Sequence, residues 1–336
     1  MLSLVARRYS NPWPGSTVAG LGSVLKWMGR RARTRRPADP SPSSFPVASP
    51  AFLAPRASDG ILTVTWVGHA STLLQLGPLN VLTDPMWSER ASPVQFAGPR
   101  RRTPPGLPLE QLPPIDLVLV SHDHYDHLDR RTVRRLLRHS PDVRWAAPVG
   151  VGRYLKKFGA TAIGEHGWWD RETASDLDVS VVCTPARHFS GRAPWNRNRT
   201  LWCGWILRAH GLSVFFAGDT ALHPEFAEIA RRFGPFDLSL IPIGAYQPQW
   251  MMQPVHMNPE EAVQAYGDVA AVHRDQGWAL PAMVPIHWGT FKLSDEPIDE
   301  PPRRLTEAWT AAGHDAQSLW LLKHGETRAR ALSPKP

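Results

Sequence analysis

The 336-residue sequence has little cysteine and no long hydrophobic run. Its two cysteines, Cys183 and Cys203, each lie inside an apolar stretch, so the sequence encodes neither a disulfide framework nor a cysteine-rich zinc site. No stretch approaches the roughly 20 apolar residues of a membrane-spanning helix, and the first residues lack the continuous apolar core of a signal peptide. We therefore expect a cytoplasmic protein, either free in solution or peripheral on a membrane surface.

Acidic residues are missing from the start of the chain. The formal net charge is +8, and residues 1–38 hold eight of the 38 lysines and arginines, with no acid before Asp39. The remaining 30 cations equal the 30 acids in number. The body of the protein is therefore neutral by count. This argues against a nucleic-acid partner, because nucleic-acid-binding proteins need a basic surface to neutralise phosphates.

The basic segment has the pattern of a short amphipathic helix. Its apolar residues recur at helical spacing among the cations: Leu21, Val24, Leu25 and Met28. Such a helix either contacts an anionic membrane surface or packs on the body of the protein. Residues 37–58 are rich in Pro, Ser and Ala and indicate a linker. We therefore expect a basic leader and linker over residues 1–58, followed by one domain over residues 59–336.

Short apolar runs broken by Gly and Pro predict strands along most of this domain. The strands are expected at 61–67, 71–76, 80–83, 116–121, 143–147, 178–184, 201–209, 212–217, 237–242 and 281–286. The helices are expected at 128–139, 149–158, 223–233, 259–276 and 303–312. Because hairpins alternate with isolated helices, we expect an α/β fold of the α+β kind, with two packed sheets and helices on their outer faces.

A dense group of potential metal ligands follows the strand expected at 116–121. Residues 122–127 (HDHYDH) hold three histidines and two aspartates. Imidazole and carboxylate suit a borderline divalent ion such as zinc. At the end of a strand the backbone is free to turn, so residues two apart can converge. The alternative, a polar loop in which Asp126 or Asp129 caps the next helix, accounts poorly for this density.

Three more potential ligands occur where other strands are expected to end. His188, Asp219 and His287 each follow a buried apolar run. Each of them alone is also typical of a loop or turn. A centre with two metal ions, however, needs roughly seven or eight protein ligands. The sequence therefore predicts a site for two divalent cations.

The motif His-x-His-x-Asp-His at 122–127, with these later residues, resembles that of the metallo-β-lactamase superfamily. Other segments resemble the N-acylphosphatidylethanolamine-hydrolysing phospholipase D family within it: 64–71 (VTWVGHAS), 83–101, 216–220 (FAGDT), 245–262 and 286–291 (IHWGTF). The resemblance extends from about Tyr9 to Phe291. It implies an αββα four-layer sandwich of the metallo-β-lactamase type, with two Zn²⁺ ions, or other divalent metals, at one edge.

The resemblance also implies which residues hold the metals. One zinc ion is expected on His122, His124 and His188. The other is expected on Asp126, His127 and His287. Asp219 is expected to bridge the two ions and so to take part in catalysis.

Three further residues are candidates for supporting roles. His256 matches a family histidine associated with the substrate phosphate. From the residue alone it is either a hydrogen-bond donor or general acid, or a surface residue that caps the helix at 259. His69 and Asp84 are candidates for orienting the ligands from behind, although an Asp before a proline is also ordinary turn chemistry.

The implied reaction is hydrolysis of a phosphodiester by a metal-bridging hydroxide, because two cations sharing a water lower its pKa. The family substrate is N-acylphosphatidylethanolamine, which yields an N-acylethanolamine and a phosphatidic acid. The segment Trp250-Met251-Met252 fits lipid contact, since soft apolar side chains adapt to acyl chains. It fits a place in the core or a homodimer contact equally well.

Three other functions fit parts of the pattern. A lactonase for phosphorylated sugars has a similar motif but little use for a basic amphipathic leader. A metal-dependent nuclease needs a net basic groove, for which only local clusters at Arg100–Arg102 and Arg130–Arg138 are available. A non-catalytic membrane-surface binding protein on the same scaffold is expected to have lost a metal ligand, and all seven are present.

Overall fold

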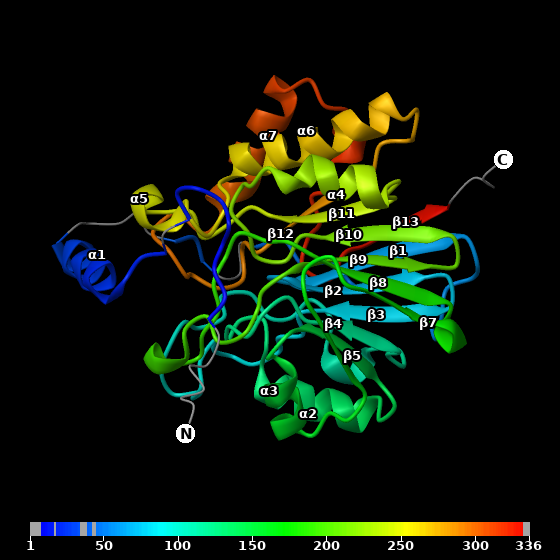
Figure 1. Ribbon diagram of the computed structural model, residues 1–336, viewed down its shortest axis with the longest axis horizontal. Helices are drawn as coiled ribbons and strands as arrows, with labels where there is room; N and C mark the ends of the chain where they lie inside the picture. Colours follow the sequence, from blue (N-terminus) through cyan, green and yellow to red (C-terminus); the bar gives the residue numbers. More distant parts are fainter. Residues whose placement is uncertain (1–7, 17, 34–38, 42–44, 332–336) are drawn as a thin grey trace, which may run out of the picture.

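The computed structural model of the chain describes residues 8–16, 18–33, 39–41 and 45–331. Two β-sheets pack face to face, and helices cover the outer face of each (Figure 1). The αββα four-layer sandwich expected from the sequence is confirmed.

The first sheet has seven strands in the order β13-β1-β2-β3-β4-β5-β6. They are β1 (Ile61–Gly68), β2 (Ser71–Leu76), β3 (Leu79–Thr83), β4 (Leu117–Leu119), β5 (Arg144–Pro148), β6 (Ile163–His166) and β13 (Thr327–Ala331). Strands β1 to β3 form an antiparallel meander, and β3 to β6 run parallel. The carboxyl ends of parallel strands meet at one edge, so the loop that follows β4 emerges there.

The second sheet has six strands in the order β12-β11-β10-β9-β8-β7. They are β7 (Arg171–Ala174), β8 (Val179–Thr184), β9 (Gly204–Ala209), β10 (Leu212–Phe216), β11 (Leu238–Pro242) and β12 (Ala282–Ile286). Strands β7 to β10 are antiparallel, whereas β10, β11 and β12 run parallel. The exits of β10 and β12 therefore lie at the same edge.

Two apolar clusters hold the four layers together. The larger one fills the space between the sheets, around Trp66 and Trp205, and continues to the helices over the second sheet. These are α4 (Glu225–Phe233), α6 (Pro259–Asp275) and α7 (Glu300–Ala311). The smaller cluster, around Trp145, joins the first sheet to α2 (Arg130–His139) and α3 (Gly152–Phe158). Burial stabilises the layers, since each fully buried Leu or Phe contributes about 1.5–3 kcal/mol.

The structure contains elements that the sequence pattern did not predict. Strands β6, β7 and β13 were not expected, and neither was the short helix α5 (Gln249–Met252). β7 and β13 are edge strands with mostly exposed or partly exposed residues, RETA and TRARA. Their side chains are mostly charged or small and stay at least partly in solvent, so neither strand has an apolar run. Their pairing partners lie far away in the sequence, so local periodicity did not reveal them.

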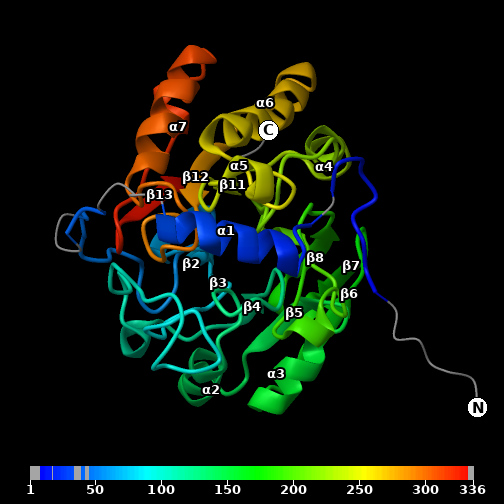
Figure 2. The same ribbon diagram turned by 90° about the vertical axis from the view of Figure 1, so that its left-hand side faces the viewer.

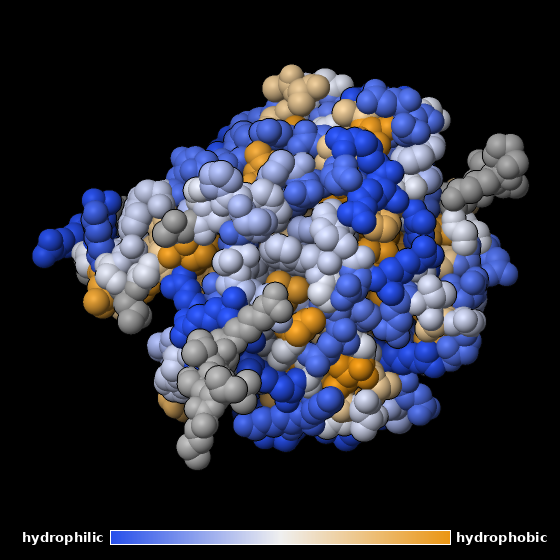
Figure 3. All heavy atoms as spheres, in the orientation of Figure 1, coloured by the Kyte–Doolittle hydropathy of each residue, from blue (hydrophilic) through white to orange (hydrophobic). Residues whose placement is uncertain are grey.

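The basic segment forms helix α1 (Leu21–Arg33). It lies across the face of the molecule on which the loops gather (Figure 2). Trp27 Nε1 donates to Asp295 Oδ2 at 2.5 Å, and Arg31 lies 3.4 Å from the same carboxylate. Leu25 and Met28 remain 68% and 57% exposed. In Figure 3, hydrophilic and hydrophobic side chains adjoin at the left-hand end, where Figure 1 places α1. Arg7, Arg35 and Arg36 lie outside the described residues.

Among residues 8–16, 18–33, 39–41 and 45–331, no helix is both long and apolar enough to cross a membrane.

Candidate metal centre

The seven potential ligands, which lie far apart in the sequence, come together at one edge of the sandwich. His122 follows β4, His188 follows β8, Asp219 follows β10 and His287 follows β12 directly. Figure 1 shows the loops from both sheets meeting at this end, beside α5 and α1. The placement expected from strand ends is therefore what the fold produces.

The first group of ligands consists of three imidazole rings. His122 Nε2 lies 2.7 Å from His124 Nδ1, and His188 Nε2 lies 3.2 Å from the same atom. Burial and the neighbouring rings hold the pKa of His122 well below its ordinary value and that of His124 at about 3. The rings are thus neutral at neutral pH, which is the form that binds a metal. Three converging ring nitrogens fit one cation.

The second group surrounds Asp126. Asp126 Oδ2 lies 2.8 Å from His69 Nε2, 3.3 Å from His127 Nε2 and 3.5 Å from His287 Nε2. Burial acts to raise the pKa of Asp126, but His127, His287 and His69 together outweigh it and hold the pKa well below its usual range. An ionised carboxylate among imidazoles is a second place for a divalent cation.

Asp219 lies between the two groups. Its Oδ2 is 3.1 Å from Nε2 of both His127 and His287. The same oxygen is 3.8 Å from His188 Nε2 and 4.0 Å from His122 Nε2. This position fits the bridging role expected for it.

Unsatisfied polar atoms show that these residues fit a metal centre. Asp219 Oδ1 and the Nε2 atoms of His127 and His287 are buried without a hydrogen-bond partner. Leaving a buried polar group unpaired costs about 1–3 kcal/mol. Two clusters of ligand atoms, one containing His122, His124 and His188 and the other His69, Asp126, His127 and His287, each lie within 4.8 Å. Divalent cations would satisfy all of these atoms at once.

Asp84 contacts His127, one of the potential ligands, from behind. Its carboxylate accepts hydrogen bonds from Ser121 N at 2.7 Å, Ser121 Oγ at 2.6 Å and His127 Nδ1 at 2.7 Å. This contact leaves Nε2 of His127 pointing at the centre. Asp84, His69 and His287 all have positive φ angles, of 34°, 56° and 63°. Non-glycine residues hold that strained conformation mainly where the surrounding structure enforces it, as at active sites.

His256 is buried at the centre and does not cap a helix. The cap of α6 is Asn258, whose side chain accepts from Glu261 N, so the capping interpretation of His256 is wrong. The His256 ring stacks on His287, with centroids 5.3 Å apart. Its Nδ1 lies 4.0 Å from Asp219 Oδ2 and has no hydrogen-bond partner. It is therefore placed to contact a group bound at the centre.

In the segment 250–252, Trp250 lies at the surface, whereas Met251 and Met252 line a cavity. Trp250 is 45% exposed, with Lys26 and Arg30 over its ring at 5.6 and 5.8 Å. Met251 and Met252 line an apolar cavity of about 320 Å³ beside α1, and His256 forms part of the same wall. Below, this space is called the apolar cavity.

Sequence reasoning missed one residue that supports the centre. Asn11 Nδ2 donates to His188 O at 2.8 Å, and Asn11 Oδ1 accepts from Trp202 Nε1 at 3.1 Å. The N-terminal segment thus holds the backbone of a potential ligand 177 residues further along. The resemblance to the family from about Tyr9 was the one available signal.

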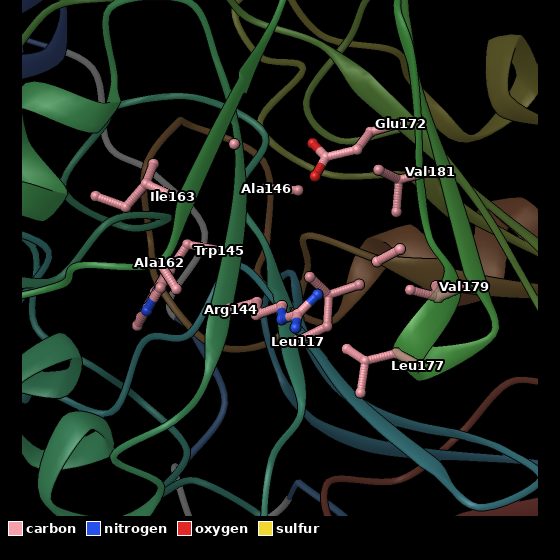
Figure 4. A pocket seen from close by; sticks show the side chains of 12 residues that line it. Leu117, Arg144, Trp145, Ala146, Ala162, Ile163, Glu172, Leu177, Val179 and Val181 are labelled. Carbon is pink, nitrogen blue, oxygen red and sulfur yellow. The ribbon is translucent and has the colours of Figure 1, made fainter.

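A different cavity lies between the sheets, away from the histidines. It has a volume of about 340 Å³ and opens between β4 to β6 and β7 to β8 (Figure 4). Its walls are mainly aliphatic, and the titratable side chains on them are Arg144 and Glu172. Arg144 is already paired with Asp176. With no histidine on its described walls, this cavity is not the metal centre.

Comparison with known families agrees with this geometry. The sequence profile of a family described as a beta-lactamase superfamily domain matches residues 79–288, which include all seven potential ligands. The chain belongs to the metallo-β-lactamase superfamily. It is accordingly a metal-dependent hydrolase.

Within the metallo-β-lactamase superfamily, two relatives are similar over most of their length. A protein of Mycobacterium tuberculosis with no characterised function is 44% identical over 282 residues, which is 83% of this chain and 70% of the relative. N-acyl-phosphatidylethanolamine-hydrolyzing phospholipase D 1 of Caenorhabditis elegans is 38% identical over 263 residues, covering 76% and 71%.

One solved structure shows the shared fold. A metallo hydrolase from the archaeon Ignicoccus hospitalis superposes with a TM-score of 0.60 at 20% identity. The match covers 81% of this chain and all of that one.

Proposed function

We propose that this hydrolase is a phosphodiesterase of phospholipase D type. Its substrates are phospholipids like N-acylphosphatidylethanolamine, and its products are an N-acylethanolamine and a phosphatidic acid. Its two metal ions are proposed to be Zn²⁺. The C. elegans relative, at 38% identity, bears the name of that activity.

The observation that carries this proposal is the apolar cavity next to the centre. Its wall contains Met251, Met252 and Val24. His256 also lines it, and the His256 ring packs against His188 and His287. A substrate with a long acyl chain fits such a space, because burying each CH₂ group contributes about 0.8 kcal/mol. A phosphorylated sugar has no chain to place there.

The side chains around the centre have different proposed roles. When bound, the metal ions supply Lewis-acid chemistry and an activated water. Asp219 and the six other potential ligands would hold those ions. His188 stays oriented because its Nδ1 donates to Val255 O at 2.8 Å. His256 Nδ1 is left over as a hydrogen-bond donor or general acid for the phosphate or the leaving alcohol.

A substrate panel tests the proposed reaction. Zinc-loaded protein is expected to hydrolyse N-acylphosphatidylethanolamine in mixed micelles and simple aryl phosphodiesters in solution. The same preparation is also offered phosphorylated sugar lactones. Lactone opening without any phosphodiester cleavage would overturn the proposal in favour of the lactonase.

The variant His256→Gln tests the assigned histidine. Glutamine cannot transfer a proton at neutral pH, and general acid–base catalysis contributes about 10²–10⁴-fold. We therefore expect turnover of N-acylphosphatidylethanolamine to fall at least about a hundredfold while metal content, measured by mass spectrometry, is retained. Unchanged turnover would remove His256 from the reaction.

Helix α1 is proposed to contact an anionic membrane surface. It presents exposed Leu25 and Met28 beside Lys26 and Arg30. A deletion of residues 1–38 would test this contact poorly, because it would also remove Asn11, which binds the backbone of His188. The double variant Leu25→Ser with Met28→Ser leaves Asn11 in place and changes only the exposed apolar side chains. This variant is expected to bind vesicles containing phosphatidylglycerol less tightly. Equal binding by both proteins would contradict the contact.

A further inference from the structure

A second cavity beside the metal centre is strongly cationic. It has a volume of about 580 Å³, within the usual range of ligand sites, and is called the cationic cavity below. It lies on the side of the face where Figure 2 shows α2 and α3. Its cationic side chains come from α2, from α3 and from the loop before β9: Arg130, Arg131, Arg134, Lys157 and Arg192.

Among the described residues, acidic side chains are scarce around these cations. Asp129 is the one acid on the described walls of the cavity. Its carboxylate accepts hydrogen bonds from the backbone at the start of α2 and from the hydroxyl groups of Ser88 and Thr132. Within the described residues, none of the cations on α2 and α3 that line the cavity forms an ion pair. Concentrated like charge of this kind attracts an anionic ligand.

The lining of the cavity includes part of the loop that carries potential metal ligands. The Arg192 guanidinium lies 3.9 Å from the centre of the Tyr125 ring, and Tyr125 stands between His124 and Asp126 in the sequence. Arg192 Nη1 donates to Asp123 O at 2.7 Å and to Leu128 O at 2.8 Å. An anion bound here would therefore sit beside the loop 122–128.

The surroundings of the cavity favour a lipid over a soluble anion. Residues 189–197 separate the two cavities, since members of this segment line both. Trp195, on the rim of the cationic cavity, is 73% exposed. Val94 and Phe96, 37% and 84% exposed, flank Gln95 in the loop that forms another wall. Exposed Trp and Phe beside cations are typical of side chains that enter the interface of a bilayer.

We propose that the cationic cavity binds the phosphate-bearing headgroup of an anionic phospholipid in the membrane surface. The reacting phosphodiester would occupy the metal centre, so this headgroup belongs to a second lipid molecule. The proposal rests on the proposed phospholipase function, because it takes a lipid surface as the place where the substrate is met.

A matched pair of double variants tests the site. Arg134→Gln with Lys157→Gln removes one cation from each helix that lines the cavity. Arg138→Gln with Lys156→Gln removes the same charge from the same helices, at exposed positions that do not line it. Each full-length protein is sedimented with vesicles of phosphatidylcholine alone or mixed with phosphatidylglycerol. Far-ultraviolet circular dichroism checks that both variants are folded.

The lining variant is expected to bind the anionic vesicles about thirtyfold more weakly than the unmodified protein, since each cation near such a surface contributes about 1 kcal/mol. The control should lose less than about threefold, because exposed charges away from the site are screened. Equal losses in the two variants would overturn the site in favour of diffuse attraction.

A second readout separates lipid from nucleic acid. If the lining variant lost binding to a single-stranded oligonucleotide while its vesicle binding stayed unchanged, the lipid assignment would be overturned. Neither measurement requires turnover. A failure of the proposed reaction would appear in the substrate panel, whereas a failure of this site would appear only in the binding assays.

Discussion

At the scale of single residues, the centre depends on which nitrogen of each histidine faces inward. His127 illustrates this, because Asp84 binds its Nδ1 and leaves Nε2 3.1 Å from Asp219. Burial acts to lower the pKa of His127, but Asp219, Asp126 and Asp84 outweigh it and hold the pKa well above its ordinary value. The three carboxylates make the electrostatic potential around this ring negative, which favours the binding of a cation.

Asp84→Asn should weaken the centre without touching a proposed ligand. Asparagine presents an amide to His127 Nδ1 and Ser121, so the ring loses its charged acceptor. Such changes behind the ligands typically cost 10–100-fold in metal affinity or activity. Metal titration and turnover of an aryl phosphodiester measure the effect, with exposed Asp142→Asn as the control. If both variants behaved alike, Asp84 would have no orienting role.

At the scale of elements, the potential ligands come together because they follow the ends of strands, and one glycine lets the chain leave β10 as it does. Gly218 has φ +65°, and a Cβ there would lie 2.5 Å from Cys203 O and 2.9 Å from Ser121 Cβ. The backbone carrying Asp219 therefore passes where a side chain cannot fit. Ser121, on the opposite side of this contact, precedes His122.

Gly218→Ala is expected to displace Asp219 and so to lower metal content and turnover together. Gly211→Ala is the matched control, because Gly211 also has positive φ, +75°, but an added Cβ meets nothing within 4 Å. Forcing alanine into positive φ costs about 1–2 kcal/mol in either variant. Only Gly218→Ala adds the steric clash. Loss of activity in the control alone would contradict this explanation.

The N-terminal segment is attached to α4 through a buried histidine. The His223 ring stacks on Trp13 at 4.7 Å and on Phe226 at 4.4 Å. Burial, with a smaller contribution from Arg187, lowers the pKa of His223 to about 3. The unfolded chain therefore binds a proton at this residue at a higher pH than the folded protein does. Its contribution to stability is complete above the unfolded pKa and is lost as pH falls from about 6.5 towards 3.

His223→Asn should remove this part of the acid sensitivity. Between pH 6.5 and 5, the unmodified protein is expected to lose about 1.6 kcal/mol more unfolding free energy than the variant, because the slope rises from about 0.7 to about 1.4 kcal/mol per pH unit over this range. Urea unfolding at the two pH values measures the difference. Parallel losses in both proteins would show that His223 does not titrate between the folded and unfolded states.

At the scale of the whole molecule, the metal centre joins the two sheets. Its potential ligands follow β4 in the first sheet and β8, β10 and β12 in the second. Bound metal should therefore stabilise the entire sandwich. At a free metal concentration a thousandfold above the dissociation constant, the gain is about 4 kcal/mol. Thermal unfolding with a chelator, and again after zinc is restored, should show a fall and a recovery of the midpoint. Identical curves would refute this coupling.

Local patterns predicted much of the fold. The strand expected at 71–76 matches β2, and the helix expected at 259–276 matches α6 to within one residue. The buried apolar run of β2 and the capping box at the start of α6 are both visible in the local sequence. Edge strands such as β13 do not, because β13 exists through pairing with β1, more than 250 residues away. The position of Asn11 against His188 likewise depends on the folded chain.

The sequence by itself determined the chemistry of the centre. Three histidines and two aspartates in six residues, with three more potential ligands after apolar runs, pointed to a metal-dependent hydrolase. Only the tertiary structure decided that Asp219 lies between the two groups, that His256 is buried beside them and that a cationic cavity adjoins their loop. The physical reason is that residue types and periodicity are local properties. Distances, burial and unpaired charge arise only when distant segments pack together.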